Sequence, residues 1–508
     1  MAPAGTNLRW RTTWAAVCLV AGAMVAHAAA AADWVVAEER WYQMLLAGTP
    51  CGFTHEVVEK ADGKVRSSTQ SEMRLGRMGQ AVVVKSRTAF TETSDGKPIE
   101  AVIEKETGAA PVRTRWLFNA DSLDIVDEQG GRTSARRVKL PTQPWLTPGA
   151  AREFVRRRVT GGAESLSYWT VDPESGPEAV RVDSKRVGKG SMQVEGRTLS
   201  TTQWESRNSM ISKPSTEELS ADGVLLLSRS DLGVGVLEAR LTSKDVATSG
   251  KGSAEVMART FVPLKQDGSA LWTSRQAKVR LVSASGKLGT LPTAGAQTFT
   301  RVGPAEATVA LDVSTPQKAE RGEDKDQRYR RASVMVDSDD PRIAALADKA
   351  LAGVPAQPMA RIAALRTAVA KHLVNKNLAS GFATASEAVV SRAGDCTEHA
   401  VLLAALLRHA GIPSRVASGL LYVAQVGQQR NAYGWHMWTQ ALVDGAWVDA
   451  DAVLPADGPI FSAGHLLVAT SAADGATMDA DFARVVELIG DLQIQLLSVN
   501  GAPAGAQP

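Results

Sequence analysis

Hydrophobic and polar positions alternate over short segments through the first half of the chain, for example at residues 81–85, 101–104 and 223–227. Successive side chains of a β-strand point to opposite faces, so this period indicates strands with one buried face. Asp-Gly and Gly-Gly pairs separate the segments and mark hairpin turns. We therefore expect residues 33–248 to form a β-rich N-terminal domain built as a large antiparallel sheet.

One segment of this region carries helical signals instead. Thr147 can cap a helix, Pro148 fits its first turn, and residues 150–158 continue it. We expect the sheet to curve around this helix. Such a curved sheet can cradle an apolar ligand or act only as a scaffold, and no residue in it indicates catalysis.

The second half of the chain changes from strands to helices. Residues 249–337 still favour strands and predict a β-leaning connecting domain. Helical patterns then begin near residue 339 and again near residue 359. The fold class is therefore expected to be α+β, with an α+β domain at residues 338–500 and a disordered tail at residues 501–508.

A third helix begins at the candidate nucleophile. Asp395 is a good N-cap, and Glu398 three residues later completes a capping-box pattern ahead of an apolar run at residues 400–410. Cys396 thus lies in the first turn, where the helix dipole favours a thiolate. We expect this thiol to ionise readily and to act as a nucleophile.

A hairpin after this helix brings a histidine and a carboxylate together. Strands at residues 435–443 and 446–452 flank a two-residue Asp-Gly turn, which fixes their register. In that register His436 lies one diagonal step from Asp451 and two steps from Asp449, all on one face. The geometry selects Asp451 as the partner of His436, and Cys396, His436 and Asp451 make the parts of an activated thiol.

Two motifs resemble the core of the transglutaminase-like superfamily: GDCTEHAVLLAALLRHAGIPSRVASGLLYV and WHMWTQALVDGAWVDADAV. The resemblance covers roughly residues 329–499. It implies a papain-like thiol enzyme whose Cys-His-Asp triad falls on Cys396, His436 and Asp451. One departure is Gln440, where many relatives carry a glutamate.

Composition and the first residues place the protein outside the cell. The 508 residues are 44% hydrophobic and 22% charged, as in a globular protein of several domains. Residues 1–32 combine two arginines, an apolar run and an Ala-x-Ala site, which predicts a signal peptide rather than an uncleaved anchor. Without residues 1–32 the chain has 57 minus 2, or 55, basic residues and 54 acidic ones. This nearly neutral balance argues against nucleic acid as a partner. We expect a periplasmic or extracellular protein with no stable membrane span after cleavage.

Other roles for the cysteines and histidines are less favoured. Cys51 and Cys396 could form a disulfide, but one functional thiol and one incidental cysteine explain them better. A zinc site of Cys396, His399 and His436 would lack a fourth ligand and occupy the nucleophile. We therefore expect no metal and no cofactor. The remaining histidines are expected to be structural or exposed: His55, His372, His409 and His465.

The predicted reaction is attack on an amide through a thioester, resolved by water or by an amine. For an exported protein we favour peptide or amide hydrolysis over acyl transfer, with a protein or peptide as substrate. The alternative is a non-catalytic binding or scaffold protein of the cell envelope with a vestigial thiol domain. The sequence does not predict the oligomeric state or the natural substrate.

Overall fold

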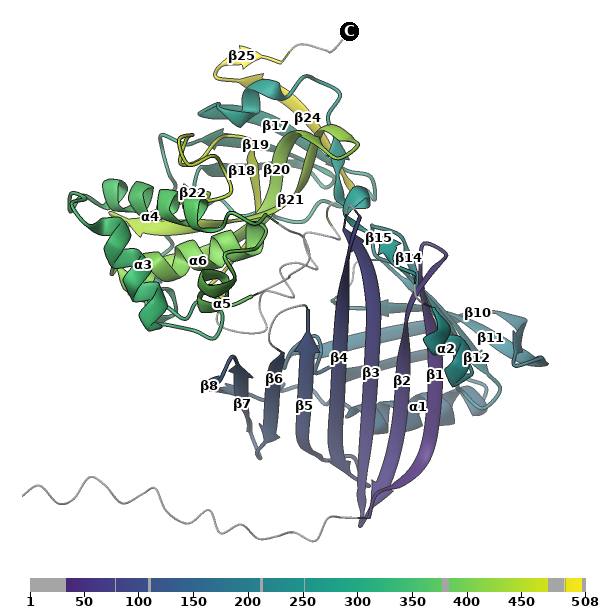
Figure 1. Cartoon of the computed structure of the whole chain (residues 1–508). Coiled ribbons are helices and arrows are strands. Elements are labelled where there is room, and N and C mark those ends of the chain that lie inside the picture. Colours follow the sequence, from purple (N-terminus) through teal and green to yellow (C-terminus); the bar gives the residue numbers. More distant parts are fainter. Residues whose placement is uncertain are drawn as a thin grey trace, which may run out of the picture.

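The computed structural model describes residues 33–504, except for residues 78, 108–110, 211–212, 251, 377–382, 474–487 and 489. The predicted signal peptide, residues 1–32, and the end of the predicted tail, residues 505–508, lie outside the described residues. Figure 1 shows two parts: a broad curved sheet made by the first half of the chain, and a part with helices and smaller sheets made by the rest.

The curved sheet contains fifteen strands, and almost every strand pairs with its neighbour in sequence. The order is β8-β7-β6-β5-β4-β3-β2-β1-β14-β13-β12-β11-β10-β9, so the β1–β14 pairing joins two runs of hairpins, and β15 pairs parallel to β3. The strands are β1 (Val35–Leu46), β2 (Thr49–Ala61), β3 (Lys64–Arg77), β4 (Gln80–Thr93), β5 (Pro98–Glu106), β6 (Val112–Phe118), β7 (Ser122–Gln129), β8 (Arg132–Lys139), β9 (Ser165–Val171), β10 (Ala179–Val194), β11 (Arg197–Asn208), β12 (Ser215–Ser220), β13 (Leu225–Asp231), β14 (Val236–Thr242) and β15 (Ala254–Glu255).

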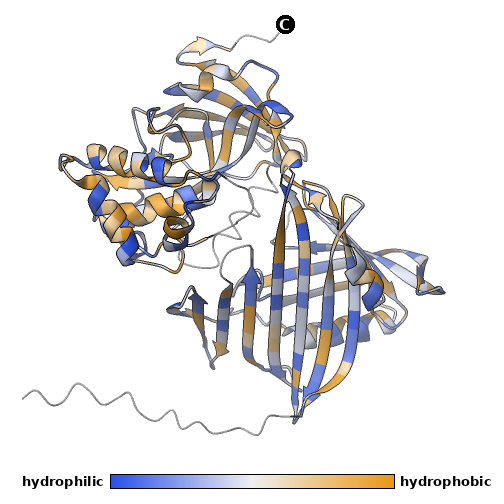
Figure 2. Cartoon of the chain, in the orientation of Figure 1, coloured by the Kyte–Doolittle hydropathy of each residue, from blue (hydrophilic) through white to orange (hydrophobic). Residues whose placement is uncertain are grey.

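Helix α1 (Pro148–Thr160) lies inside the curve of this sheet (Figure 1). Its buried Val159 packs in a cluster with Trp204. The carboxylate of Glu92 accepts two backbone N–H groups of the first turn, at 3.0 and 3.1 Å, where a negative charge stabilises a helix. The expected antiparallel sheet curved around one helix is confirmed. Apolar and polar residues alternate along its strands in Figure 2, as a sheet with one buried face requires. A short helix, α2 (Lys244–Ser249), follows the sheet.

The second part contains two further sheets. One has the order β16-β21-β20-β23, with β22 also paired to β21, and the other has the order β18-β19-β17-β24-β25. The elements are β16 (Val262–Pro263), β17 (Gln276–Ser283), β18 (Gln297–Gly303), β19 (Glu306–Asp312), β20 (Ser414–Val426), β21 (Gln429–Val443), β22 (Ala446–Ala450), β23 (His465–Ser471), β24 (Leu492–Val499), β25 (Ala502–Pro503) and the 3-10 turns η1 (Met257–Thr260), η2 (Ser269–Trp272), η3 (Glu323–Lys325) and η4 (Gln327–Tyr329).

Residues 249–337 contribute strands to both of these sheets. β16 pairs with β21, and β17 pairs with β24. One buried cluster contains Val279, Leu420 and Ile494, so this segment and the C-terminal strands share a hydrophobic core. Within the stretch expected as a tail, Ala502–Pro503 form β25 against β24. The domain boundaries themselves stay predictions.

Helix α6 (Cys396–His409) is the centre of the helical layer. Every residue from Thr397 to Arg408 is buried, which is typical of a helix enclosed on all sides. It packs against β21 and against α3 (Pro341–Leu351), α4 (Pro358–His372) and α5 (Ala385–Ser391). The sequence predicts three of these helices, whereas α5, with only seven residues, gives too short a pattern. The α+β fold class is confirmed.

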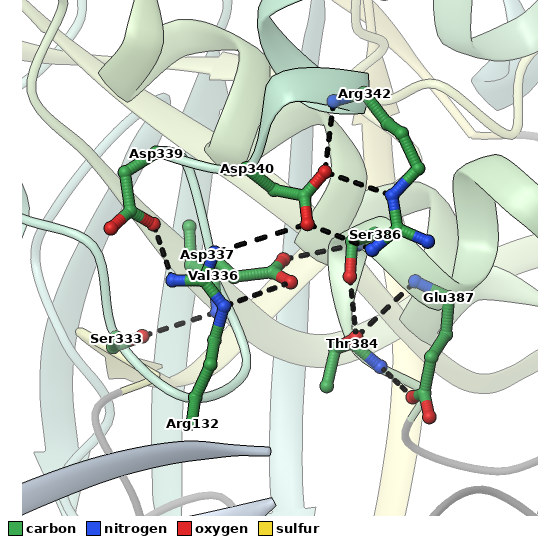
Figure 3. A network of polar contacts seen from close by, with 10 residues as sticks. All are labelled: Arg132, Ser333, Val336, Asp337, Asp339, Asp340, Arg342, Thr384, Ser386 and Glu387. Atoms are coloured by element: carbon green, nitrogen blue, oxygen red, sulfur yellow. Dashed lines mark hydrogen bonds and ion pairs between the residues drawn. The ribbon is translucent and has the colours of Figure 1, made fainter. Parts of the chain in front are cut away.

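Two arginines of the curved sheet form ion pairs with the second part. The guanidinium of Arg132, at the start of β8, lies among three carboxylates (Figure 3): Asp339 at 2.5 Å, Asp337 at 3.7 Å and Asp340 at 3.9 Å. The second arginine is Arg77, at the end of β3, which pairs with Asp395 at 2.5 Å. The sheet therefore contacts the residue directly before Cys396.

Among the helices in the described part of the chain, none combines the length and the apolar character needed to cross a membrane.

Candidate active site

The capping of α6 fixes the position of Cys396. The Asp395 carboxylate accepts the backbone N–H of Thr397 at 2.9 Å, and the Glu398 carboxylate accepts the backbone N–H of Asp395 at 2.9 Å. This is the predicted capping box. Cys396 is the first residue of the helix and is half-buried.

An open stretch in the edge of β21 lies against this thiol. Along that edge β16 pairs with residues 432–433 and β22 with residues 439–443. β22 stops because Asp451 turns away and donates its N–H to Ile460 at 2.9 Å. Met437 lies on β21 just past the residues that pair with β22. Among the described residues its backbone N–H therefore has no strand partner on this edge, and it donates to the Cys396 thiol. The break in the sheet thus supplies a donor to the candidate nucleophile.

The expected histidine–carboxylate pair is present next to Met437, the residue whose N–H contacts the thiol. Nε2 of His436 lies 2.9 Å from Oδ2 of Asp451, and both side chains are buried. The predicted register is also observed, with Val443 opposite Ala446 and Gln440 opposite Asp449. That these residues are catalytic stays a prediction.

The charge of Asp451 fixes the proton position on His436. Burial alone would raise the pKa of Asp451, but the charges and hydrogen bonds of its two histidine neighbours hold that pKa well below its usual range. An ionised carboxylate only accepts, so the hydrogen between the two groups is carried by Nε2 of His436. Within the described residues no hydrogen bond joins Cys396 to His436; the two are linked through the backbone of Met437.

The expectation that Cys396 ionises readily is not met. Burial raises the pKa of the thiol well above its usual value, and the neighbouring negative charge of Asp395 raises it further. The Met437 N–H and the charge of Arg77 act in the opposite direction but are smaller effects. Desolvation of the first turn therefore outweighs the helix dipole, and the thiol holds its proton at rest.

His465 is a member of the site that the sequence did not indicate. Its Nε2 lies 3.1 Å from the same Asp451 oxygen, and its Nδ1 lies 2.9 Å from the Ser462 carbonyl. The ring stacks on Phe461 at a centroid distance of 4.0 Å. The pairing of β23 with β20, which are separated by about 40 residues of sequence, brings His465 there.

Asp449 has a different task from Asp451, although only one residue separates them. It accepts from Trp438 Nε1 at 2.7 Å, from Gln440 Nε2 at 2.7 Å and from the Ala296 N–H at 2.7 Å. Burial raises the pKa of Asp449. These three hydrogen bonds connect β21 and β22 to the loop before β18. Asp449 therefore holds these three segments in place.

Gln440 fits between a cation and an anion. Its Oε1 accepts from Arg415 Nε at 2.8 Å while its Nε2 donates to Asp449. A glutamate here would place two buried carboxylates side by side. Arg415 instead finds its counter-charge in Glu323 of η3, at 2.6 Å. The amide is therefore matched to both neighbours.

The candidate zinc ligands are not assembled. His399 turns its Nδ1 to the Asp395 carbonyl at 2.7 Å, and within the described residues the one cluster with metal-ligand spacing is His436, Asp451 and His465. In that cluster the Nε2 atoms of both histidines lie within hydrogen-bond distance of the same Asp451 oxygen. Cys51 and Cys396 are both free thiols, and Cys51 is fully buried in the sheet.

Comparison with known proteins identifies one stretch of the chain. The family model of the transglutaminase-like superfamily matches residues 344–452, from α3 to just past β22. The comparison with curated proteins found no match.

Three solved structures show similarity to this chain. One is a β-barrel-like protein of a domain of unknown function from Brucella abortus, with 12% identity, a TM-score of 0.32, and coverage of 40% of this chain and 94% of that one. Another is a candidate cysteine protease from Cytophaga hutchinsonii, with 16% identity, a TM-score of 0.29, and coverage of 46% and 84%. The third is a candidate protease from Parabacteroides distasonis, with 10% identity, a TM-score of 0.18, and coverage of 71% and 68%.

Proposed function

Residues 344–452 form a transglutaminase-like domain, and we propose that the protein is an exported thiol enzyme that cleaves or transfers amide bonds through a thioester on Cys396. The observation that carries this proposal is the hydrogen bond from His436 to Asp451. It leaves the Nδ1 lone pair of His436 as a base, one residue from the N–H that contacts the thiol. Export rests on the signal-like pattern of residues 1–32.

The reaction starts from a neutral thiol. Nδ1 of His436 takes the thiol proton as the sulfur attacks the amide carbon, and Asp451 stabilises the resulting imidazolium. The backbone N–H of Cys396 is the nearest donor for the developing oxyanion. The C–N bond then breaks, and the leaving amine takes the proton from the imidazolium. The acyl group remains on the sulfur as a thioester.

Either water or an amine resolves the thioester. His436, again neutral, removes a proton from the attacking molecule, and the thiol leaves with that proton. Water gives a free acid, whereas an amine gives a new amide. We favour hydrolysis of a peptide or other amide, because export into a dilute medium offers water in excess of any amine.

A binding protein with a vestigial thiol domain is the second candidate, and one observation favours it. The raised pKa of Cys396 is that of a buried structural thiol. Against it, the His436–Asp451 hydrogen bond is complete, and a buried ionised carboxylate without a use is costly to keep.

Alkylation by iodoacetamide across pH separates the two candidates. For an enzyme, His436 accepts the proton and Cys396 reacts near pH 7, whereas an unassisted thiol reacts only above about pH 8.5. The variant His436→Ala should lose the reaction near pH 7. His409→Ala, at the far end of α6, is the matched control and should behave as wild type. Identical profiles for wild type and His436→Ala would exclude the proposed function.

Incubation with mixed peptides and a labelled amine then identifies the reaction. Cleaved peptides indicate a hydrolase, and incorporated label indicates a transferase. The variant Cys396→Ser should give neither product. Absence of both products with wild type, despite a reactive thiol, would favour the binding protein.

A further inference from the structure

We propose that a cavity between the curved sheet and the start of α6 is a substrate subsite, which holds one apolar side chain on the carbonyl side of the bond that Cys396 attacks. This inference rests on the proposed function and adds the side-chain specificity of the same site. It also gives the large sheet a role in the reaction.

The cavity has a volume of about 140 Å³ and walls from both parts of the molecule. The sheet contributes Leu75 and Arg77 from β3 and Val82 and Val84 from β4. Further apolar wall comes from Val256 and Met257 before and in η1, and from Trp435 of β21. The lining is thus mostly hydrocarbon and aromatic surface, which favours an apolar occupant.

The position of the cavity relates it to the nucleophile. Asp395 and Thr397, the residues on either side of Cys396, both line it. Trp435, the residue before His436, lines it from the strand. An acyl carbon bonded to the Cys396 sulfur would therefore carry its neighbouring side chain beside this wall.

The size of the cavity limits the occupant. A cavity of about 150 Å³ with apolar walls binds one benzene molecule, whereas sites for larger ligands span roughly 300–1,000 Å³. The space therefore has the size that the side chain of a leucine or a phenylalanine fills.

The charges at the wall cancel each other. Arg77 lies 2.5 Å from Asp395, and their side chains are only 17% and 7% exposed. Paired in this way, they offer no net charge to an ionic side chain. The pair also holds β3 against the first turn of α6, so the sheet wall and the thiol keep a fixed separation.

Two thiol-directed reagents that differ in one side chain test the subsite. The probes are N-acetyl-leucine chloromethyl ketone and N-acetyl-glycine chloromethyl ketone. In each, the Cys396 sulfur displaces chloride from the chloromethyl carbon, and the ketone carbonyl lies between that carbon and the variable position. We expect the leucine reagent to inactivate the full-length protein roughly tenfold faster or more, because an isobutyl group leaves water on binding. Equal rates for the two reagents would overturn the subsite.

Variants of Val84 localise the preference. Val84→Trp fills the cavity and should reduce the leucine-to-glycine rate ratio to near one. Val84→Ala enlarges it and should shift the preference toward the phenylalanine reagent. Val83→Trp, on the opposite face of β4, is the matched control and should keep the wild-type ratio. An unchanged ratio in Val84→Trp, or in Val84→Ala if the larger variant does not fold, would overturn the inference.

Iodoacetamide distinguishes failure of the subsite from failure of the proposed function. It carries no side chain, so its rate near pH 7 reports the thiol and its base alone. If wild type fails to react with it there, the proposed function is wrong. If wild type reacts but shows no side-chain preference, only the subsite is wrong.

Discussion

One ion pair of the curved sheet and one cluster of the second part differ sharply in their exposure to water. In the curved sheet, ion pairs such as Arg137–Asp124 lie at the surface, with side chains 69% and 31% exposed. In the second part, His436, Asp451 and His465 meet with side chains no more than 7% exposed. Surface pairs contribute little to stability, whereas buried charges are costly unless each has partners.

The difference shows what each part contributes to the site. Buried and partnered titratable groups in the second part are the groups that can move protons. The sheet places only an ion pair and an apolar wall beside them. If this division is correct, substitutions in the second part alter the reaction and its pH dependence. Substitutions in the sheet alter the fit of the substrate or the contact between the two parts.

The largest effect is expected from Asp451→Asn. An amide cannot accept from both histidines at one atom and from the Val453 N–H at the other. We expect amide turnover to fall about 10³- to 10⁴-fold, as when other triads lose the carboxylate. Steady-state kinetics on an active peptide provides the measurement.

Asp449→Asn is the matched control for that change. It removes the same charge at a position that only holds β21, β22 and the loop before β18 in place. Turnover per folded molecule should therefore change less than tenfold. The cost should appear in stability instead, at roughly 1–3 kcal/mol, because a buried donor loses its acceptor. Comparable losses of turnover in the two variants would break the distinction between the carboxylates.

Glu398 should make stability depend on pH. Burial, together with the charge of Asp395, raises the pKa of Glu398 to about 7, from an ordinary value of 4.5. The folded state therefore favours the protonated form, and the stability from this group is complete below pH 4.5 and lost as pH rises through 7. The loss is about 3 kcal/mol at roughly 1.4 kcal/mol per unit.

The variant Glu398→Gln isolates the pH dependence, because the glutamine oxygen can keep the capping-box bond to the Asp395 N–H. The Ala383 N–H loses its acceptor in this variant, which lowers stability by the same amount at every pH. Urea unfolding between pH 4.5 and 8 should show a smaller loss of stability in the variant than in wild type. Equal slopes would assign the pH dependence to other groups.

Asp395→Asn should make the thiol more reactive. Asparagine caps a helix as well as aspartate does, but it removes a charge that raises the pKa of Cys396. The pKa of the thiol should therefore fall, and alkylation by iodoacetamide near pH 7 should become severalfold faster. A slower reaction would mean that Asp395 acts on the thiol through Arg77 rather than through its own charge.

The smallest effect is expected from Arg132→Ala. Its shortest ion pair, with Asp339, joins side chains 31% and 65% exposed, and its contacts with the buried Asp337 and Asp340 are 3.7 and 3.9 Å long. Those two carboxylates also accept from Ser386 and Arg342, so the loss of Arg132 should cost only about 1 kcal/mol. Thermal unfolding should shift slightly, and thiol alkylation should match wild type. A large loss of alkylation would show that the sheet affects the chemistry through this distant contact.

Local rules were sufficient for part of the fold and of the candidate site. The Asp-Gly turn at residues 444–445 set the register that pairs His436 with Asp451, and the capping box placed Cys396 at a helix start. Both depend on residues close in sequence. The alternating strands and short turns of the large sheet likewise predicted its antiparallel pairing.

Long-range contacts supply what the sequence did not indicate. His465 reaches Asp451 only because β23 pairs with β20, and the open edge at Met437 exists only because β16 and β22 stop on either side of it. The raised pKa of Cys396 reflects burial by segments distant in sequence. No local pattern reports how deeply a first turn is enclosed.

The pairing of β17 with β24 has a consequence for the order of assembly. The large sheet needs only the first half of the chain for its hairpins and for the β1–β14 pairing. By contrast, Val279 of β17 pairs with Leu496, near the other end of the chain, so its sheet cannot be completed until that segment is synthesised. Domains that emerge first generally fold first, and distant pairings form slowly. We therefore expect the curved sheet to fold before Cys396 is brought next to His436 and Asp451. The thiol should become reactive only when synthesis of the chain is nearly finished.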